Sequence, residues 1–280
     1  MKKHLNHIIV KHAAKLFTSA LVAAAVMAVA DLKADPDRNP DGSINTGNAS
    51  IFTVLTHGDF TATGSSSVTG NVGVSGSGNF NMQNSATVKG DLYMNSGGTI
   101  TIANSATLKG HRNLHQDLLL TNAWTDALNL SNAAAAELVT PAYSSLTNVD
   151  LSNNSNITIT GSANQKVVLS LQNFRLSGAS SFTLQGTATT TFIINVANNF
   201  SLSNSAAINL VGVPTANVLF NVLGSGTVQL SGSSKMSGTL LAVNSVVVLN
   251  TNSGSVTGRV IAKSVILQNS SKVVTPVTNP

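Results

Sequence analysis

The acidic and histidine side chains that can do acid–base or metal chemistry are few, and all of them lie before Leu151. The candidates beyond the N-terminal segment are His57, Asp59, Asp91, His111, His115 and Asp117. Two histidines four residues apart, such as His111 and His115, can share a metal ion on a helix. No Glu accompanies them as a base, and Asp117 points off that side. Polar residues at a helix start are therefore the simpler interpretation.

The second half of the chain excludes most enzyme classes. The 130 residues from Leu151 to Pro280 contain no Asp, Glu, His, Cys, Tyr or Trp. General acid–base pairs, thiol nucleophiles and carboxylate or imidazole metal sites cannot form there. A hydrolase triad would need a histidine and an elbow of the G-x-S-x-G type, and that motif does not occur. We expect no catalytic residue, no metal and no cofactor, so the protein is not expected to be an enzyme.

The net charge of +5 is concentrated at the N-terminus. Residues 1–30 hold four lysines and no acid, and beyond them eleven Lys/Arg face ten Asp/Glu. The balance beyond residue 30 gives no reason to expect a nucleic acid partner. A basic start, an apolar run from Leu16 to Ala30 and small residues at Ala28 and Ala30 predict a secretory signal peptide. A buried helix or an uncleaved anchor are the alternatives, although the run is short for a membrane span.

An internal repeat organises the rest of the chain. The segment Asn84-Ser85-Ala86-Thr87-Val88-Lys89-Gly90 recurs twenty residues later with only Val88 replaced, by Leu108. A relaxed template, apolar-x-apolar-x-(Asn/Gly)-(Ser/Ala)-x-x-apolar, fits nine times. Its first position falls at Phe60, Phe80, Ile100, Val149, Phe174, Phe200, Val228, Val248 and Val265. Its fifth position is always Asn or Gly: Gly64, Asn84, Asn104, Asn153, Gly178, Asn204, Gly232, Asn252 and Asn269.

This template predicts a strand, a corner and a second strand. Alternating apolar residues place one side of each strand in a core, and Asn or Gly tolerates a positive φ at the corner. Stacked Asn side chains at the corner are expected to bond one another. We predict an all-β dominated fold, a parallel β-solenoid (β-helix) of about nine coils that bury their apolar residues against one another. A β-sandwich with many hairpins is the alternative.

A helical insert interrupts the repeat. Residues 115–138 contain neither Gly nor Pro, are rich in Leu and Ala, and precede Pro141. They predict one long helix packed alongside the solenoid, with Trp124 as its anchor. We therefore predict a signal peptide at 1–30, an exposed lead-in at 31–50, a solenoid at 51–274 with the insert 115–138, and a tail at 275–280. Without cysteine, burial and backbone hydrogen bonds alone hold the fold together.

Ligand binding is the remaining class of function, and outward threonines are its candidates. Flat arrays of Thr on one face would suit ice, but neither the second nor the tenth template position gives a clean array, and Lys89 and Lys109 interrupt the better one. Short Thr alternations do occur, and solvent-facing β-branched residues of ordinary strands are the alternative interpretation. The candidate surface residues are Thr99, Thr101, Thr158, Thr160, Thr187, Thr189 and Thr191.

Several short segments resemble known families. The segments 191–196 (TFIINV), 217–222 (NVLFNV), 237–242 (SGTLLA) and 257–263 (TGRVIAK) look like the choice-of-anchor A family of exported bacterial proteins. Segments 68–75 (VTGNVGVS) and 258–263 resemble the ice-binding-like β-solenoid family, which places a helix beside its solenoid. The Pro-Gly-Val-Tyr segment usual in ice-binding members has no counterpart after Thr147, and the C-terminal sorting signal of anchored members has none in residues 275–280.

Together these features predict a secreted or cell-surface β-solenoid without enzymatic activity. We expect it to act as an adhesion or structural module on an extracellular surface, a matrix or a polysaccharide that the sequence does not name. Ice binding is the alternative function. We expect no nucleic acid partner and no membrane span once the signal peptide is removed.

Overall fold

The computed structural model describes Asp35 and residues 37–275. The chain divides into two compact units, Met1–Asp35 and Pro36–Pro280, and every described helix and strand belongs to the second. The predicted signal peptide at 1–30 and nearly all of the predicted tail lie outside the described residues.

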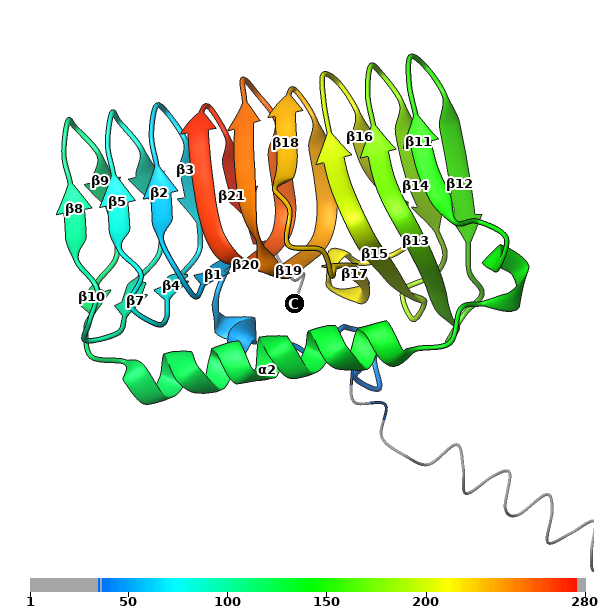
Figure 1. Cartoon of the computed structure of the whole chain (residues 1–280), viewed down its shortest axis with the longest axis horizontal. Coiled ribbons are helices and arrows are strands. Elements are labelled where there is room, and N and C mark those ends of the chain that lie inside the picture. Colours follow the sequence, from blue (N-terminus) through cyan, green and yellow to red (C-terminus); the bar gives the residue numbers. More distant parts are fainter. Residues whose placement is uncertain (1–34, 36, 276–280) are drawn as a thin grey trace, which may run out of the picture. The chain divides into compact units, whose positions relative to one another are not determined.

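The described chain forms a three-sided parallel β-solenoid (Figure 1). Face 1 is built from β1 (Val54–Thr56), β4 (Val72–Val74), β7 (Leu92–Met94), β10 (Arg112–Asn113) and β17 (Val218–Val222). Face 2 contains β2 (Phe60–Ala62), β5 (Phe80–Met82), β8 (Ile100–Ile102), β11 (Asn148–Leu151) and β18 (Val228–Gly232). Face 3 contains β3 (Ser67–Thr69), β6 (Thr87–Val88), β9 (Thr107–Leu108), β12 (Asn156–Thr160), β14 (Ser181–Gln185), β16 (Ala207–Val211) and β21 (Lys272–Val274).

Four long strands turn corners and so contribute to more than one face. β13 (Lys166–Leu176) and β15 (Thr191–Leu202) run over faces 1 and 2, while β19 (Lys235–Thr251) and β20 (Ser255–Asn269) run over all three. Nine strands lie side by side on face 2, in the order β8, β5, β2, β20, β19, β18, β15, β13 and β11. The predicted solenoid of about nine coils is confirmed.

The order of the coils differs from their order in the chain. Phe60 in the first coil pairs on one side with Phe80 and on the other with Val265 of the last coil. The chain therefore starts in the middle of the stack, builds three coils toward one end, crosses to the far end and returns to the middle. In Figure 1 the late strands β20 and β21 accordingly lie beside the early strands β2 and β3.

Inward side chains stack in columns through the core. On face 2, Phe60 lies on Phe80 with ring centroids 5.2 Å apart, and Phe174 lies on Phe200 at 5.0 Å. All four rings are fully buried or nearly so. Complete burial of one such side chain contributes on the order of 1.5–3 kcal/mol, so these columns are the main source of stability in a chain without disulfides.

The predicted corner geometry is confirmed at eight of the nine Asn/Gly positions, where φ lies between 53° and 69°. Side-chain rungs link some corners: the Asn104 amide donates to Asn84 Oδ1 at 3.3 Å, and the Asn269 amide bonds Asn250. Asn252 is the exception. It belongs to the eighth copy of the repeat, which the template starts at Val248. Val228 pairs with Val247 instead, so the register predicted for this eighth copy is wrong by one residue. Its corner contains one extra residue, which the template could not detect.

Helix α2 (Asp117–Ala136) lies along face 1, which confirms the predicted insert (Figure 1). Its buried residues are Leu120, Ala123, Trp124, Ala127, Leu130, Ser131 and Ala134, spaced three or four apart as on one side of a helix. They share a second core with Leu55, Val168, Ile193, Leu219, Leu241 and Ile261 on face 1. Trp124 is 8% exposed and stacks on the His57 ring at 4.9 Å, as expected for an anchor.

A buried polar network fixes where the helix sits on face 1. Asn221 donates to the Ser131 carbonyl at 2.9 Å and to Asn195 Oδ1 at 2.9 Å. Asn195 donates to the Ala134 carbonyl at 2.7 Å, and the Ser131 hydroxyl donates to Asn221 Oδ1 at 2.8 Å. Buried amides are stable only when bonded, so this network favours one helix position over any slipped one.

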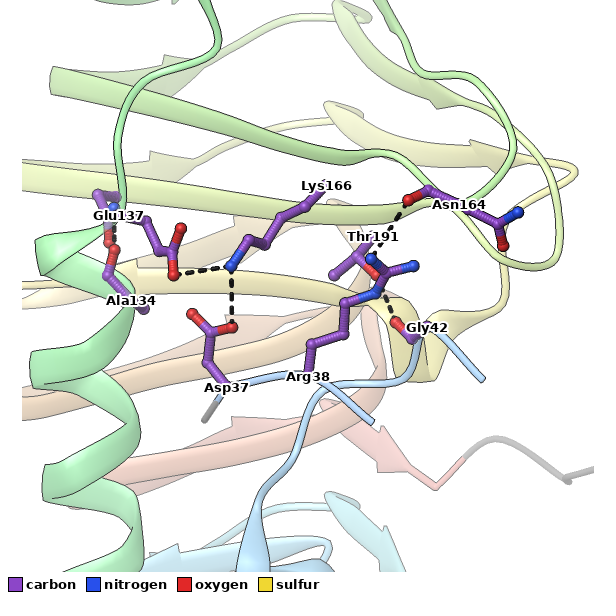
Figure 2. A network of polar contacts seen from close by, with 9 residues as sticks. Asp37, Arg38, Gly42, Ala134, Glu137, Asn164, Lys166 and Thr191 are labelled. Atoms are coloured by element: carbon purple, nitrogen blue, oxygen red, sulfur yellow. Dashed lines mark hydrogen bonds and ion pairs between the residues drawn. The ribbon is translucent and has the colours of Figure 1, made fainter. Parts of the chain in front are cut away.

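The lead-in is not the exposed segment that its composition predicts. Ile44 and Ala49 are buried, and the short helix η1 (Gly47–Ile51) packs against α2. Figure 2 shows the ion pairs of Lys166, whose ammonium lies 2.7 Å from Glu137 and 3.4 Å from the buried Asp37. The polar composition of the lead-in is misleading because Ile44 and Ala49 are buried in the core that α2 shares with face 1. The other short helices are η2 (Pro141–Tyr143) and η3 (Thr215–Asn217).

Candidate binding faces

The carboxylates that could have served catalysis are engaged in holding the fold. Asp59 Oδ1 accepts the Asn79 backbone N–H at 2.8 Å, and Asp91 Oδ1 accepts that of His111 at 2.7 Å. Asp117 accepts both the backbone N–H and the hydroxyl of Ser96 at 3.0 Å. Each carboxylate therefore links one coil to the next, and these three form no acid–base pair with one another.

The His111 and His115 pair does not form the helical metal motif. The helix begins at Asp117, after both residues, and His115 has a φ of 58°. The His111 ring lies 3.3 Å from Asp91 and is largely exposed. His57 is occupied by its stacking on Trp124 and by a 3.1 Å contact from Nδ1 to the Ser75 hydroxyl. These placements fit structural roles for the three histidines rather than metal binding.

Local contacts rather than a buried catalytic cluster explain the pKa shifts. The backbone N–H and then the hydroxyl of Ser96 lower the pKa of the partly exposed Asp117 carboxyl by stabilising its charged form. Ser43 lowers the pKa of Asp41 in the same way. Burial lowers the pKa of the Arg259 guanidinium, which donates to the Ser50 carbonyl at 3.0 Å. A shallow hollow beside α2 holds Asp126, whose carboxylate already accepts two bonds from Asn48.

The seven candidate threonines do not form one surface. Thr99 and Thr101 lie on face 2 in the outermost coil, whereas Thr158 and Thr160 lie on face 3 at the opposite end of the stack. Thr187 and Thr189 lie in the loop between β14 and β15. Thr191 is fully buried and donates to the Gly42 carbonyl, so its assignment to a surface site is wrong. It follows the pattern of an exposed strand residue, but the packed lead-in covers it.

Face 2 carries an outward column that is uncharged over seven consecutive strands. From one end of the stack the column reads Thr101, Asn81, Thr61, Ile266, Val248, Gln229, Ser201, Arg175 and Asp150. Leu249, expected in this column from the repeat, is instead buried because of the register shift at Val247. Charge appears only on the last two strands, where Arg175 and Asp150 are register partners.

Face 3 carries two outward columns, which differ from the column on face 2 because they include lysines along the stack. The eighth template position reads Thr107, Thr87, Ser67, Lys272, Ser255, Lys235, Ala207, Ser181 and Asn156 along the stack. The tenth reads Lys109, Lys89, Thr69, Val274, Thr257, Ser237, Asn209, Thr183 and Thr158. Lys235 and Lys272 are not among the residues predicted from the sequence, because they occupy the eighth template position rather than the second or the tenth.

The family comparison agrees with this geometry. Residues 45–273 match the family model described as an ice-binding-like adhesive domain. The chain belongs to this family. The matched region covers the solenoid, α2 and the end of the lead-in, so all three faces are part of the family domain.

Several solved structures of similar fold are ice-binding proteins. The glycosylated ice-binding protein LeIBP from an Arctic yeast aligns with a TM-score of 0.59 and 19% identity, covering 87% of this chain and 97% of that one. A protein from the Antarctic ascomycete Antarctomyces psychrotrophicus gives 0.54 and 19%, covering 85% and 100%. The ice-binding protein_1 domain of Shewanella frigidimarina gives 0.51 and 16%, covering 82% and 96%.

These likenesses establish the fold. At such low identity they do not transfer the ligand. A search among curated proteins finds no match. Within the described residues, no helix has the length and apolar character needed to cross a membrane.

Proposed function

We propose that the protein is an exported, non-enzymatic β-solenoid that acts as an extracellular or cell-surface adhesion or structural module. The observation that carries the proposal is the pair of long, uncovered strand faces. Faces 2 and 3 each present outward residues in register across nine strands, whereas α2 covers face 1. A regular, rigid surface of this kind suits binding to an extended partner rather than to a small substrate. Membership of an adhesive domain family supports the same function.

The chemistry of the described residues also favours binding over turnover. The candidate carboxylates Asp59, Asp91 and Asp117 each accept backbone hydrogen bonds that join adjacent coils. A hydrolytic solenoid needs clustered carboxylates at the point of bond cleavage. The outward columns of faces 2 and 3 carry a single carboxylate, Asp150. Polysaccharide turnover that disappears on changing Asp59 or Asp91 would contradict this proposal.

A retention assay tests the proposal directly. The fluorescently labelled full chain is incubated with intact bacterial cells and with polysaccharide-coated beads, and the fraction kept after washing is measured. We expect retention, and we expect it to fall when Gln229→Glu on face 2 is combined with Ser237→Glu on face 3. Asn122→Glu combined with Asn132→Glu, both on the exposed side of α2, adds the same charge and is the matched control, which should change nothing. Absence of retention on every surface would contradict the proposal, and so would an equal loss in the control.

Ice binding is the second candidate, and one observation favours it. The uncharged column on face 2 spans seven strands and includes the apolar Ile266 and Val248 at its centre. A broad charge-free face is what adsorption to ice would require. The column on face 2 lacks a regular array of Thr, however, and therefore favours ice binding less than adhesion. If ice were the ligand, Val248→Lys would abolish ice activity, whereas Thr257→Lys on face 3 would preserve it.

A further inference from the structure

Face 3 carries charge of one sign only in its two outward columns. Its two outward columns contain eighteen positions, of which four are exposed lysines: Lys89, Lys109, Lys235 and Lys272. None of the eighteen is Asp or Glu. No described carboxylate forms an ion pair with any of these four lysines. The nearest acid in sequence is Asp91, two residues beyond Lys89, and it already accepts the His111 N–H.

The strand registers set the spacing of these charges. Lys89 and Lys109 occupy adjacent strands, which lie about 4.8 Å apart in a parallel sheet. Lys272 and Lys235 share one column with Ser255 between them, so two strand steps, roughly 10 Å, separate them. Lys89 and Lys109 lie in the tenth-position column, whereas Lys235 and Lys272 lie in the eighth, two residues away along the strand. The four lysines therefore form a band two columns wide over six coils. A band of positive charge that runs along the stack fits an extended polyanion.

The other outward residues of face 3 indicate which kind of polyanion would bind. In the six coils that contain the lysines, seven of the eight remaining outward positions are Ser or Thr, which offer hydroxyl donors and acceptors beside the lysines. A polyuronate carries a carboxylate and free hydroxyls on its sugar rings, so it can use both groups. Duplex DNA carries about one charge per 1.7 Å and no free sugar hydroxyl. The sparse lysines and dense hydroxyls of face 3 match the first polymer better.

We infer that face 3 is the binding site for an acidic polysaccharide, held by the four lysines and by the neighbouring Ser and Thr hydroxyls of the same two columns. The inference rests on the proposed adhesive function and names the chemical class of its partner. The lysines supply attraction that salt weakens, and the hydroxyls supply contacts that distinguish a sugar polymer from other anions.

The test measures binding of the full chain to immobilised alginate, a polyuronate, with neutral dextran and double-stranded DNA in parallel. Because Lys2, Lys3, Lys11 and Lys15 would also attract polyanions, every variant is made in a background where these four are changed to Gln. In that background Lys89→Gln, Lys109→Gln, Lys235→Gln and Lys272→Gln are combined. We expect this quadruple variant to bind alginate about tenfold or more weakly than the background that keeps the four lysines. Added salt should weaken alginate binding by that background.

Two matched variants separate face 3 from net charge. Lys263→Gln with Arg175→Gln removes two positive charges outside face 3 and should leave affinity nearly unchanged, whereas Lys89→Gln with Lys109→Gln removes two from face 3 and should lower it. Replacing the four face 3 lysines with Arg should preserve binding. An unaffected quadruple variant would overturn the inference. Binding to DNA as tight as to alginate, or no binding to alginate, would also overturn it.

The two proposals fail in different ways. If the chain is retained on cells or other surfaces but does not bind alginate, the adhesive function stands and the assignment of face 3 is wrong. If the chain is retained on no surface, the adhesive function itself is wrong. If alginate binding depends on the four lysines, both are supported.

Discussion

Phe60 and Val265 are register partners in the parallel sheet, although they belong to the first and last coils of the chain. Their pairing joins the two halves of the stack at its centre, and Val273 pairs with Val68 on the neighbouring face. The solenoid is therefore closed by a contact between residues far apart in sequence. Helix α2 carries the chain from one end of the stack to the other and makes this arrangement possible.

We expect Phe60→Ala to destabilise the fold strongly, because the ring is fully buried at this junction and stacks on Phe80. Truncating a buried Phe costs about 3–5 kcal/mol. Ile100→Ala in the outermost coil is the control, since Ile100 is only partly buried and has a neighbour on one side. Urea unfolding followed by circular dichroism measures both. Equal losses would contradict a central role for the junction.

The sequence predicts the repeating parts of this fold better than their order. The template finds the inward columns because apolar alternation is a local signal, and the composition of 115–138 predicts α2 and its anchor Trp124. It cannot predict that Phe60 meets Val265, because every coil presents a similar apolar edge to its neighbours. It also cannot detect the register shift at Val247, since one extra corner residue preserves the pattern on both sides.

The candidate sites were harder to predict than the fold. The placement of Thr191 depends on the lead-in, whose packing follows from contacts distant in sequence rather than from its polar composition. By contrast, the lysines of face 3 lie at fixed template positions, so the correct register places them without further information.

The corner at Asn204 provides a test of the backbone geometry, because its φ is 58° whereas Asn252 does not adopt a positive φ. Asn204→Ala should cost about 1 kcal/mol, since a left-handed conformation is unfavourable for residues with an ordinary Cβ. Asn204→Gly should be neutral or slightly stabilising, and Asn252→Ala should have little effect. Denaturant midpoints report all three. A larger loss at Asn252 than at Asn204 would refute the register assigned to the eighth copy.

The polar network under α2 predicts that loss of one small side chain, Asn221, strongly lowers the free energy of unfolding. Asn221→Ala removes donors from the Ser131 carbonyl and Asn195 Oδ1, and both acceptors stay buried. An unsatisfied buried polar group costs about 1–3 kcal/mol, so the free energy of unfolding should fall by at least this amount. Asn198→Ala removes an exposed 3.2 Å bond to Gln172 and should be nearly silent. Similar effects of the two changes would mean that the network does not hold the helix.

Trp124 is the only tryptophan in the chain and reports directly on helix docking. It is buried between α2 and face 1, in the core that includes Leu55 and Ile193. Because this core is shared, we expect tryptophan fluorescence and strand circular dichroism to change over the same range of denaturant. A fluorescence transition at lower denaturant, with the strand signal intact, would show that the helix undocks independently.

We propose above that this solenoid acts as an adhesive surface rather than as an ice-binding protein. Thermal hysteresis of the full chain, measured together with inhibition of ice recrystallisation at micromolar concentration, tests it most directly. The account predicts no thermal hysteresis and no effect on recrystallisation beyond that of a control protein. Clear hysteresis that is lost in Val248→Lys and preserved in Thr257→Lys would contradict it and assign ice to face 2.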